Sequence, residues 1–171
     1  MDRMTSIAMA LKNEEIEMNF YRNEAKRSRN QLAQTMFEKL AKEEGEHMRR
    51  IRKLHDGLVE QKSWPVDVPI EVNGTNIKEI LLKTAQQSGS EKNHNLDDKK
   101  AIEKAIEFEA KGAAFYKELA TKCDNPMEKN FFTFMAGIER EHHLSLVDSL
   151  VFLTDPRAWL EQHEHQGLDG A

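Results

Sequence analysis

The sequence predicts an all-α protein folded as an antiparallel four-helix bundle, and three observations support this fold class. Eight Gly and four Pro residues among 171 amount to about 7% of the chain, against about 12% in average usage. Apolar residues recur at alternating steps of three and four, which is the seam of a bundle helix. The chain also repeats itself, so its helices are expected in two similar pairs.

Helix-breaking residues divide the chain into four long helices and a short fifth. We expect these helices at residues 4–27, 31–62, 98–122, 126–153 and 156–165. Asn125 is a suitable N-cap for the fourth helix, with Pro126 at its first position. Asp155 and Pro156 repeat that arrangement at the start of the fifth. The connection 63–97 is long for a compact domain, and a crossover that starts the third helix at the far end of the bundle explains its length.

The two halves of the chain match without a gap at a shift of 95 residues. The matched pairs include Ile7 and Ile102, Glu14 and Glu109, Tyr21 and Tyr116, Glu44 and Glu139, and His47 and His142. Each half therefore forms one helical hairpin, at residues 4–62 and 98–153. We expect the two hairpins to pack together in a single domain that spans residues 1–171.

Each seam carries ionisable residues in its middle. Glu14 and Glu109 lie on the first and third helices, and Glu-x-x-His motifs lie on the second and fourth. Each seam Glu is about 15 residues, or roughly 22 Å at 1.5 Å per residue, from its hairpin turn. Residues three apart share a helix face. Four Glu and two His side chains should therefore meet at one level of the core.

A cluster of four buried carboxylates is unfavourable unless cations compensate it. Two divalent cations would balance four carboxylates. Oxygen and nitrogen ligands without thiolate suit Fe, Mn or Zn. The alternative is a metal-free bundle whose six polar core residues satisfy one another, but the seams carry no basic residue to pair with the carboxylates.

This ligand set resembles that of the rubrerythrin branch of the ferritin-like di-iron superfamily. Those proteins take one Glu from each of two helices and Glu-x-x-His from each of the other two. The resemblance covers both halves and implies a ferritin-like bundle that holds two iron ions, with Mn or Zn as possible substitutes. It implies terminal carboxylates at Glu14 and Glu109, bridging carboxylates at Glu44 and Glu139, and imidazole ligands at His47 and His142.

The resemblance also implies further roles near the site. Tyr21 and Tyr116 would hydrogen-bond the site carboxylates, the alternative being ordinary core aromatic residues. Similar rubrerythrins carry an extra Glu three residues after the third-helix ligand, where this chain has Gly112. The equivalent residue of the first half is Glu17, which is either a seventh ligand or a solvated charge.

Other candidate groups fit the site less well. A third Glu-x-x-His, from Glu91 to His94, has no repeat partner and is interpreted as a coincidence. The tail histidines His163 and His165 leave open a frayed docking helix or a peripheral metal site. Cys123 is the only cysteine and is interpreted as an incidental thiol. A single thiol excludes the four-thiolate iron site of a rubredoxin domain.

The function predicted from these features is a non-haem di-iron oxidoreductase active in oxidative stress. It would reduce peroxide or O₂ with electrons from an external donor, either a rubredoxin-like protein or a small reductant. The alternatives are ferroxidation for iron storage, which needs a hollow cage, and a bundle that metal merely stabilises. We expect a homodimer for the enzyme.

Composition limits the partners and the compartment. The net charge of −5 argues against general nucleic-acid binding, which needs a basic stripe. The sequence contains no run of about 18 apolar residues, which a helix needs to span a membrane. Residues 1–5 carry no signal-peptide pattern, so we expect the protein in the cytoplasm.

Overall fold

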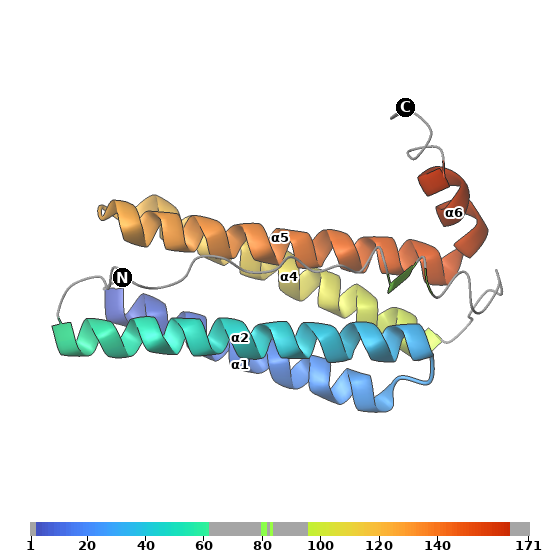
Figure 1. The fold of residues 1–171 in the computed structure, drawn as a ribbon, viewed down its shortest axis with the longest axis horizontal. Coiled ribbons are helices and arrows are strands. Elements are labelled where there is room, and N and C mark those ends of the chain that lie inside the picture. The colour runs from blue at the N-terminus through green and yellow to red at the C-terminus, as the bar shows by residue number, and fades with distance from the viewer. Residues whose placement is uncertain (1–2, 62–79, 82, 84–95, 165–171) are drawn as a thin grey trace.

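The computed structural model describes residues 3–61, 80–81, 83 and 96–164, and in this part of the chain every regular element is a helix. The helices are α1 (Arg3–Arg27), α2 (Gln31–Gln61), α4 (Leu96–Lys122), α5 (Pro126–Thr154) and α6 (Pro156–Glu164). The four long helices pack as a bundle, with α6 at one end (Figure 1). The predicted all-α bundle is thus confirmed. None of the described helices carries an apolar stretch long enough to cross a membrane.

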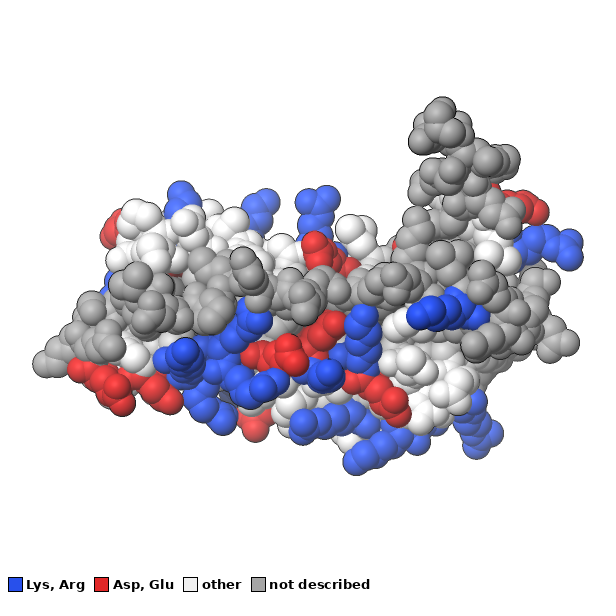
Figure 2. Space-filling view, in the orientation of Figure 1, with Lys and Arg blue, Asp and Glu red and all other residues white. Residues whose placement is uncertain are grey.

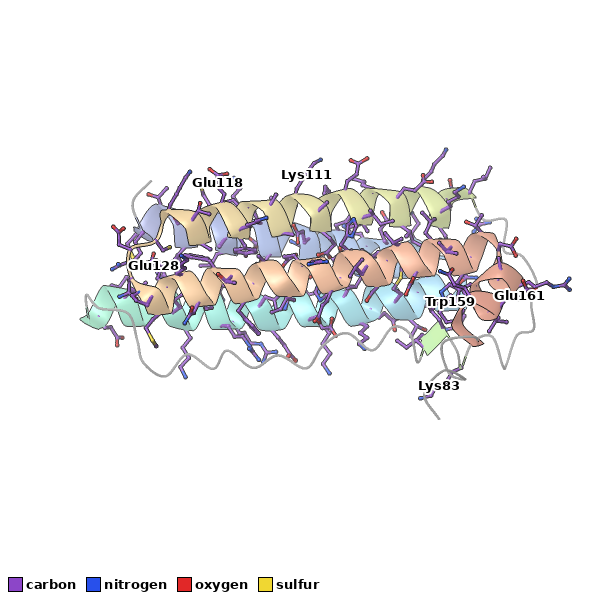
Figure 3. All side chains as sticks on the ribbon, turned by 90° about the horizontal axis from the view of Figure 1, so that it is seen from above. Lys83, Lys111, Glu118, Glu128, Trp159 and Glu161 are labelled. Carbon is purple, nitrogen blue, oxygen red and sulfur yellow. The ribbon has the colours of Figure 1, made fainter. Side chains whose placement is uncertain are left out.

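The bundle is a stack of two antiparallel hairpins. Figures 1 and 3 show α4 above α1 and α5 above α2. At one end, the Arg3 side chain at the start of α1 donates to Glu128 near the start of α5, at 2.8 Å. At the other end, the backbone N–H of Asn30, between α1 and α2, donates to Asp98 of α4 at 3.2 Å. The third long helix therefore begins at the end of the bundle opposite to the end of α2, as a crossover requires. Most of the predicted crossover, 63–97, lies outside the described residues.

Asparagine caps start the second helix of each hairpin. The side chain of Asn30 accepts a hydrogen bond from the backbone N–H of Ala33 at 2.9 Å, and that of Asn125 accepts from Met127 at 2.9 Å. An Asn N-cap is worth about 1 kcal/mol relative to Ala. The third long helix begins at Leu96, two residues before the predicted start at 98.

The hydrophobic core has two parts, one toward each end of the bundle. Tyr21 stacks on Phe37 in one part, with ring centroids 6.0 Å apart. Tyr116 stacks on Phe132 in the other, at 6.2 Å. The internal repeat is therefore visible in the packing as well as in the sequence. The predicted polar cluster lies between the two apolar parts.

Helix α6 closes one end of the core. Trp159 of α6 is fully buried and meets Phe152 of α5 edge to face, with centroids 5.4 Å apart. Figure 3 shows Trp159 where α6 folds back on the end of α5.

The outer surface of the bundle carries charges of both signs. Figure 2 shows basic and acidic side chains intermingled over α2, so charges of opposite sign lie close together on that face.

Candidate metal centre

The structure brings all six predicted cluster residues together in the middle of the bundle. Each of them is at most 1% exposed. Their ligand atoms form two groups, and the atoms in each group lie within 4.8 Å of one another. The first group is Glu14, Glu44, His47 and Glu139, and the second is Glu44, Glu109, Glu139 and His142. Glu44 and Glu139 belong to both groups.

The carboxylate of Glu44 faces both imidazole rings. Its Oε2 atom lies 2.9 Å from Nδ1 of His47, and its Oε1 atom lies 3.1 Å from Nδ1 of His142. The two rings stack with centroids 5.5 Å apart and planes 16° from parallel. Nδ1 of His47 also lies 3.0 Å from Glu14, while Nδ1 of His142 lies 3.5 Å from Glu109. Each carboxylate oxygen of Glu44 thus lies beside the histidine of a different half of the cluster.

The cluster strongly perturbs its own ionisation. Burial would raise the pKa of Glu44, but the two histidines outweigh it and hold that pKa well below its usual value. Burial would lower the pKa of His47, but Glu44 and Glu14 raise it to about 10. Burial and then Glu44 raise the pKa of Glu14 to about 7. Without a cation, therefore, protons compensate the carboxylates, and metal binding would release them.

Glu139 provides the clearest test of whether these residues fit a metal. Both of its carboxylate oxygens are buried, and neither has a hydrogen-bond partner among the described residues. Burial and the neighbouring Glu109 raise its pKa well above the usual value. An unsatisfied buried acceptor costs about 1–3 kcal/mol, and a cation beside both oxygens would remove that cost. The oxygen and nitrogen donors of the cluster fit a pair of Fe, Mn or Zn ions.

The two tyrosines connect the hairpins at the cluster. The hydroxyl of Tyr21 in α1 donates a hydrogen bond to Glu109 in α4, and that of Tyr116 in α4 donates to Glu14 in α1. Burial and the adjacent carboxylates raise the pKa of both tyrosines well above 10, so both remain donors. The family resemblance implies contact with site carboxylates, but the crossing between hairpins appears only in the structure.

Comparison with known proteins agrees with this geometry. The family model described as Rubrerythrin matches residues 6–88 and 100–167. The chain belongs to the rubrerythrin family. It is similar in structure to a hypothetical protein from Pyrococcus furiosus, with 20% sequence identity, 90% of each chain covered and a TM-score of 0.62. That likeness shows the fold alone. No protein of curated function matches the chain.

Glu17 is a fifth carboxyl group, buried beside the four carboxylates and two imidazoles of this rubrerythrin-family cluster. It is only 8% exposed, so the interpretation as a solvated charge is wrong. Burial, followed by Glu44 and Glu109, raises its pKa to about 10. Glu17 lies outside both groups of ligand atoms. Its repeat partner is Gly112, where a Cβ atom would come within 3.0 Å of Oε2 of Glu139.

One neighbour of the centre escapes the sequence analysis. Glu43 of α2 lies 3.0 Å from Nε2 of His142, although it stands one position off the seam and no motif marks it. The only available signal is that Glu43 breaks the repeat, because Ile138 occupies the equivalent position.

Of the remaining candidates, the structure describes Cys123, which belongs to neither group of ligand atoms. The Cys123 thiol donates to the carbonyl of Leu119 at 3.1 Å, and burial followed by Glu128 raises its pKa to about 11. It is therefore a poor nucleophile at neutral pH. The other predicted groups lie outside the described part of the chain, namely Glu91, His94, the side chain of His163, and His165.

Proposed function

We propose that this rubrerythrin-family protein is a non-haem di-iron oxidoreductase that reduces hydrogen peroxide or O₂. The supporting observation is that Glu44 and Glu139 belong to both groups of ligand atoms. Two carboxylates shared in this way would bridge a pair of metal ions. A bound pair of ferrous ions would supply the two electrons that convert peroxide to water.

The ligand roles follow from the two groups. Glu14 and His47 would complete one metal position, and Glu109 and His142 the other. Glu17 is the candidate seventh ligand, since it is buried beside the cluster and interacts electrostatically with Glu44, Glu109 and His142.

Other side chains prepare the site. Tyr21 and Tyr116 hold Glu109 and Glu14 by hydrogen bonds from their hydroxyl groups, which fixes the orientation of these carboxylates. The carboxyl group of Glu17, with its raised pKa, can hold a proton beside the centre at neutral pH. The apolar parts of the core on either side exclude bulk water.

Peroxide consumption by the iron-loaded protein tests the proposal. The protein is loaded with ferrous iron without oxygen, supplied with reduced rubredoxin and given hydrogen peroxide. Glu44→Ala removes one shared ligand and should abolish turnover. Glu38→Gln removes an exposed carboxylate of the same helix and should not. Turnover by the native protein no faster than that of Glu44→Ala would refute the proposal.

Two further measurements define the native state. Elemental analysis of the purified protein identifies the metal, for which we expect iron. The mass in solution should be that of a homodimer, whereas a hollow 12-mer or 24-mer would indicate iron storage instead. Turnover with reduced rubredoxin and with a small reductant, compared side by side, identifies the class of external donor.

A further inference from the structure

The internal repeat fails at two positions beside the metal centre, and at both the first hairpin carries a carboxyl group that the second hairpin lacks. Glu43 of α2 corresponds to Ile138 of α5, and Glu17 of α1 corresponds to Gly112 of α4. The six cluster residues and the two tyrosines, by contrast, match residue for residue. The surroundings of the two metal positions are therefore unequal, although their ligands are of the same types.

Glu43 contacts the outer nitrogen of His142. A carboxylate oxygen of Glu43 accepts a hydrogen bond from Nε2 of that ring at 3.0 Å, and the two side chains are 13% and 2% exposed. Nδ1 of the same ring faces Glu44 and Glu109. Protonation of Nε2 leaves the lone pair on Nδ1, and a carboxylate acceptor makes that imidazole a stronger ligand.

His47 has no such support. Its Nδ1 atom faces Glu44 and Glu14, so it too would bind metal through Nδ1. Its Nε2 atom is buried and has no hydrogen-bond partner among the described residues. The residue equivalent to Glu43 is Ile138, which is 7% exposed and cannot accept a hydrogen bond. One imidazole is thus oriented by a carboxylate, and the other is not.

Glu17 adds to the same asymmetry. It is 8% exposed and interacts electrostatically with Glu44, Glu109, Glu14 and His142. The equivalent residue, Gly112, offers no carboxylate to the other half.

We propose that the metal position formed with Glu109 and His142 binds a divalent cation more tightly and fills first, and that Glu43 is its positioning residue. This inference rests on the metal pair of the proposed function, but it does not require peroxide reduction. It predicts two separate steps of metal binding in a protein whose two ligand sets are chemically alike. Outer-shell partners of this kind contribute about 10- to 100-fold in metal affinity.

Titration of the metal-free protein with Co²⁺ alone tests the inference. The absorbance of bound Co²⁺ should rise in two steps whose dissociation constants differ by about 10-fold or more. The first equivalent should shift the imidazole NMR resonances of His142 before those of His47. Two equal steps, or filling of the His47 position first, would overturn the inference.

Variants at position 43 test whether Glu43 causes the difference between the two dissociation constants. Glu43→Ile gives α2 the residue that α5 carries at the equivalent position, Ile138. It should lower the metal affinity of the first step by about 10- to 100-fold. Glu43→Gln keeps an acceptor oxygen, so it should retain the Nε2–H resonance of His142 and lose less affinity. Glu38→Gln, on the exposed face of the same helix, should change neither step.

The converse variant and the activity separate this inference from the proposed function. Ile138→Glu supplies the missing acceptor and should tighten the second step. If Glu43→Ile fails to fold by circular dichroism, the Gln and Ile138→Glu variants still decide the outcome. Unchanged dissociation constants in these variants would refute the role of Glu43. Two unequal steps in a protein that reduces no peroxide would refute the proposed function alone.

Discussion

Gly112→Ala tests whether the centre needs free space beside Glu139. A Cβ atom at Gly112 would lie 3.0 Å from Oε2 and 3.4 Å from the carboxyl carbon of Glu139, so the carboxylate must move by a few tenths of an ångström. Gly137 offers a matched control, because it is also inside a helix and a Cβ there meets nothing within 4 Å. Replacing Gly by Ala inside a helix gains about 0.5–1 kcal/mol.

The two variants should differ in Tm and in metal affinity once metal is bound. Gly137→Ala should raise Tm by about 2–4 °C per kcal/mol gained, with and without metal. In the metal-free protein the Glu139 carboxylate has no hydrogen bonds to lose, so Gly112→Ala should keep much of the same gain. Two metal ions would fix that carboxylate, and overpacking then costs about 1–3 kcal/mol. Metal binding should weaken by about 5- to 150-fold.

Thermal unfolding in a chelator and in Co²⁺, together with calorimetric titration, measures both quantities. Gly112→Ala should show a smaller rise of Tm on metal loading than either the native protein or Gly137→Ala. If Gly112→Ala binds metal as tightly as Gly137→Ala, then Glu139 does not occupy a fixed position between two metals, and the reasoning fails.

Three further changes give measurable outcomes. Tyr21→Phe and Tyr116→Phe each remove a hydroxyl that donates to a buried carboxylate, and each should lower metal affinity or stability by about 1.5–3 kcal/mol; an effect in only one of them would contradict the equivalence of the repeats. The raised pKa values of Glu14, from 4.5 to about 7, and of His47, from 6.5 to about 10, mean that the folded metal-free protein binds more protons than the unfolded chain. The stability that these two groups contribute should therefore be complete below their unfolded pKa values and should be lost as pH rises from 4.5 toward 10, whereas metal loading should remove much of this loss; thermal melts that are independent of pH in that range would argue against it. Trp159→Ala should cost about 3–5 kcal/mol in denaturant unfolding, because that side chain is fully buried, and a cost under about 1 kcal/mol would show that α6 is not needed by the core.

The level at which the six cluster residues meet was predictable from the sequence. Each seam Glu stands at an equal number of residues from its hairpin turn, and helical rise converts that number directly into height. This argument does not depend on the structure of the crossover 63–97. The all-α fold follows from the same periodicity, whereas the ligand roles of the six residues stay predictions that metal analysis can test.

Helix periodicity could not reveal what lies one position off the seam. Glu43 and Glu17 are charged and stand beside seam residues, so the pattern favours solvent exposure. Their burial depends on how the hairpins rotate against each other, which heptad spacing does not determine. The direction of Tyr21 and Tyr116 escapes prediction for a related reason, because a long side chain can reach a carboxylate on its own hairpin or on the other.

The crossed hydrogen bonds of Tyr21 and Tyr116 make the centre a joint property of two similar halves. Neither hairpin alone holds a complete set, since each ligand group includes residues from both. Separate hairpins would have to meet as a dimer, and their occupancy would depend on protein concentration. Joining the two copies in one chain makes that encounter intramolecular, with an effective concentration that dilution does not change. If the centre binds a metal pair, the covalent link would keep both halves of the site together even in a protein present at low concentration.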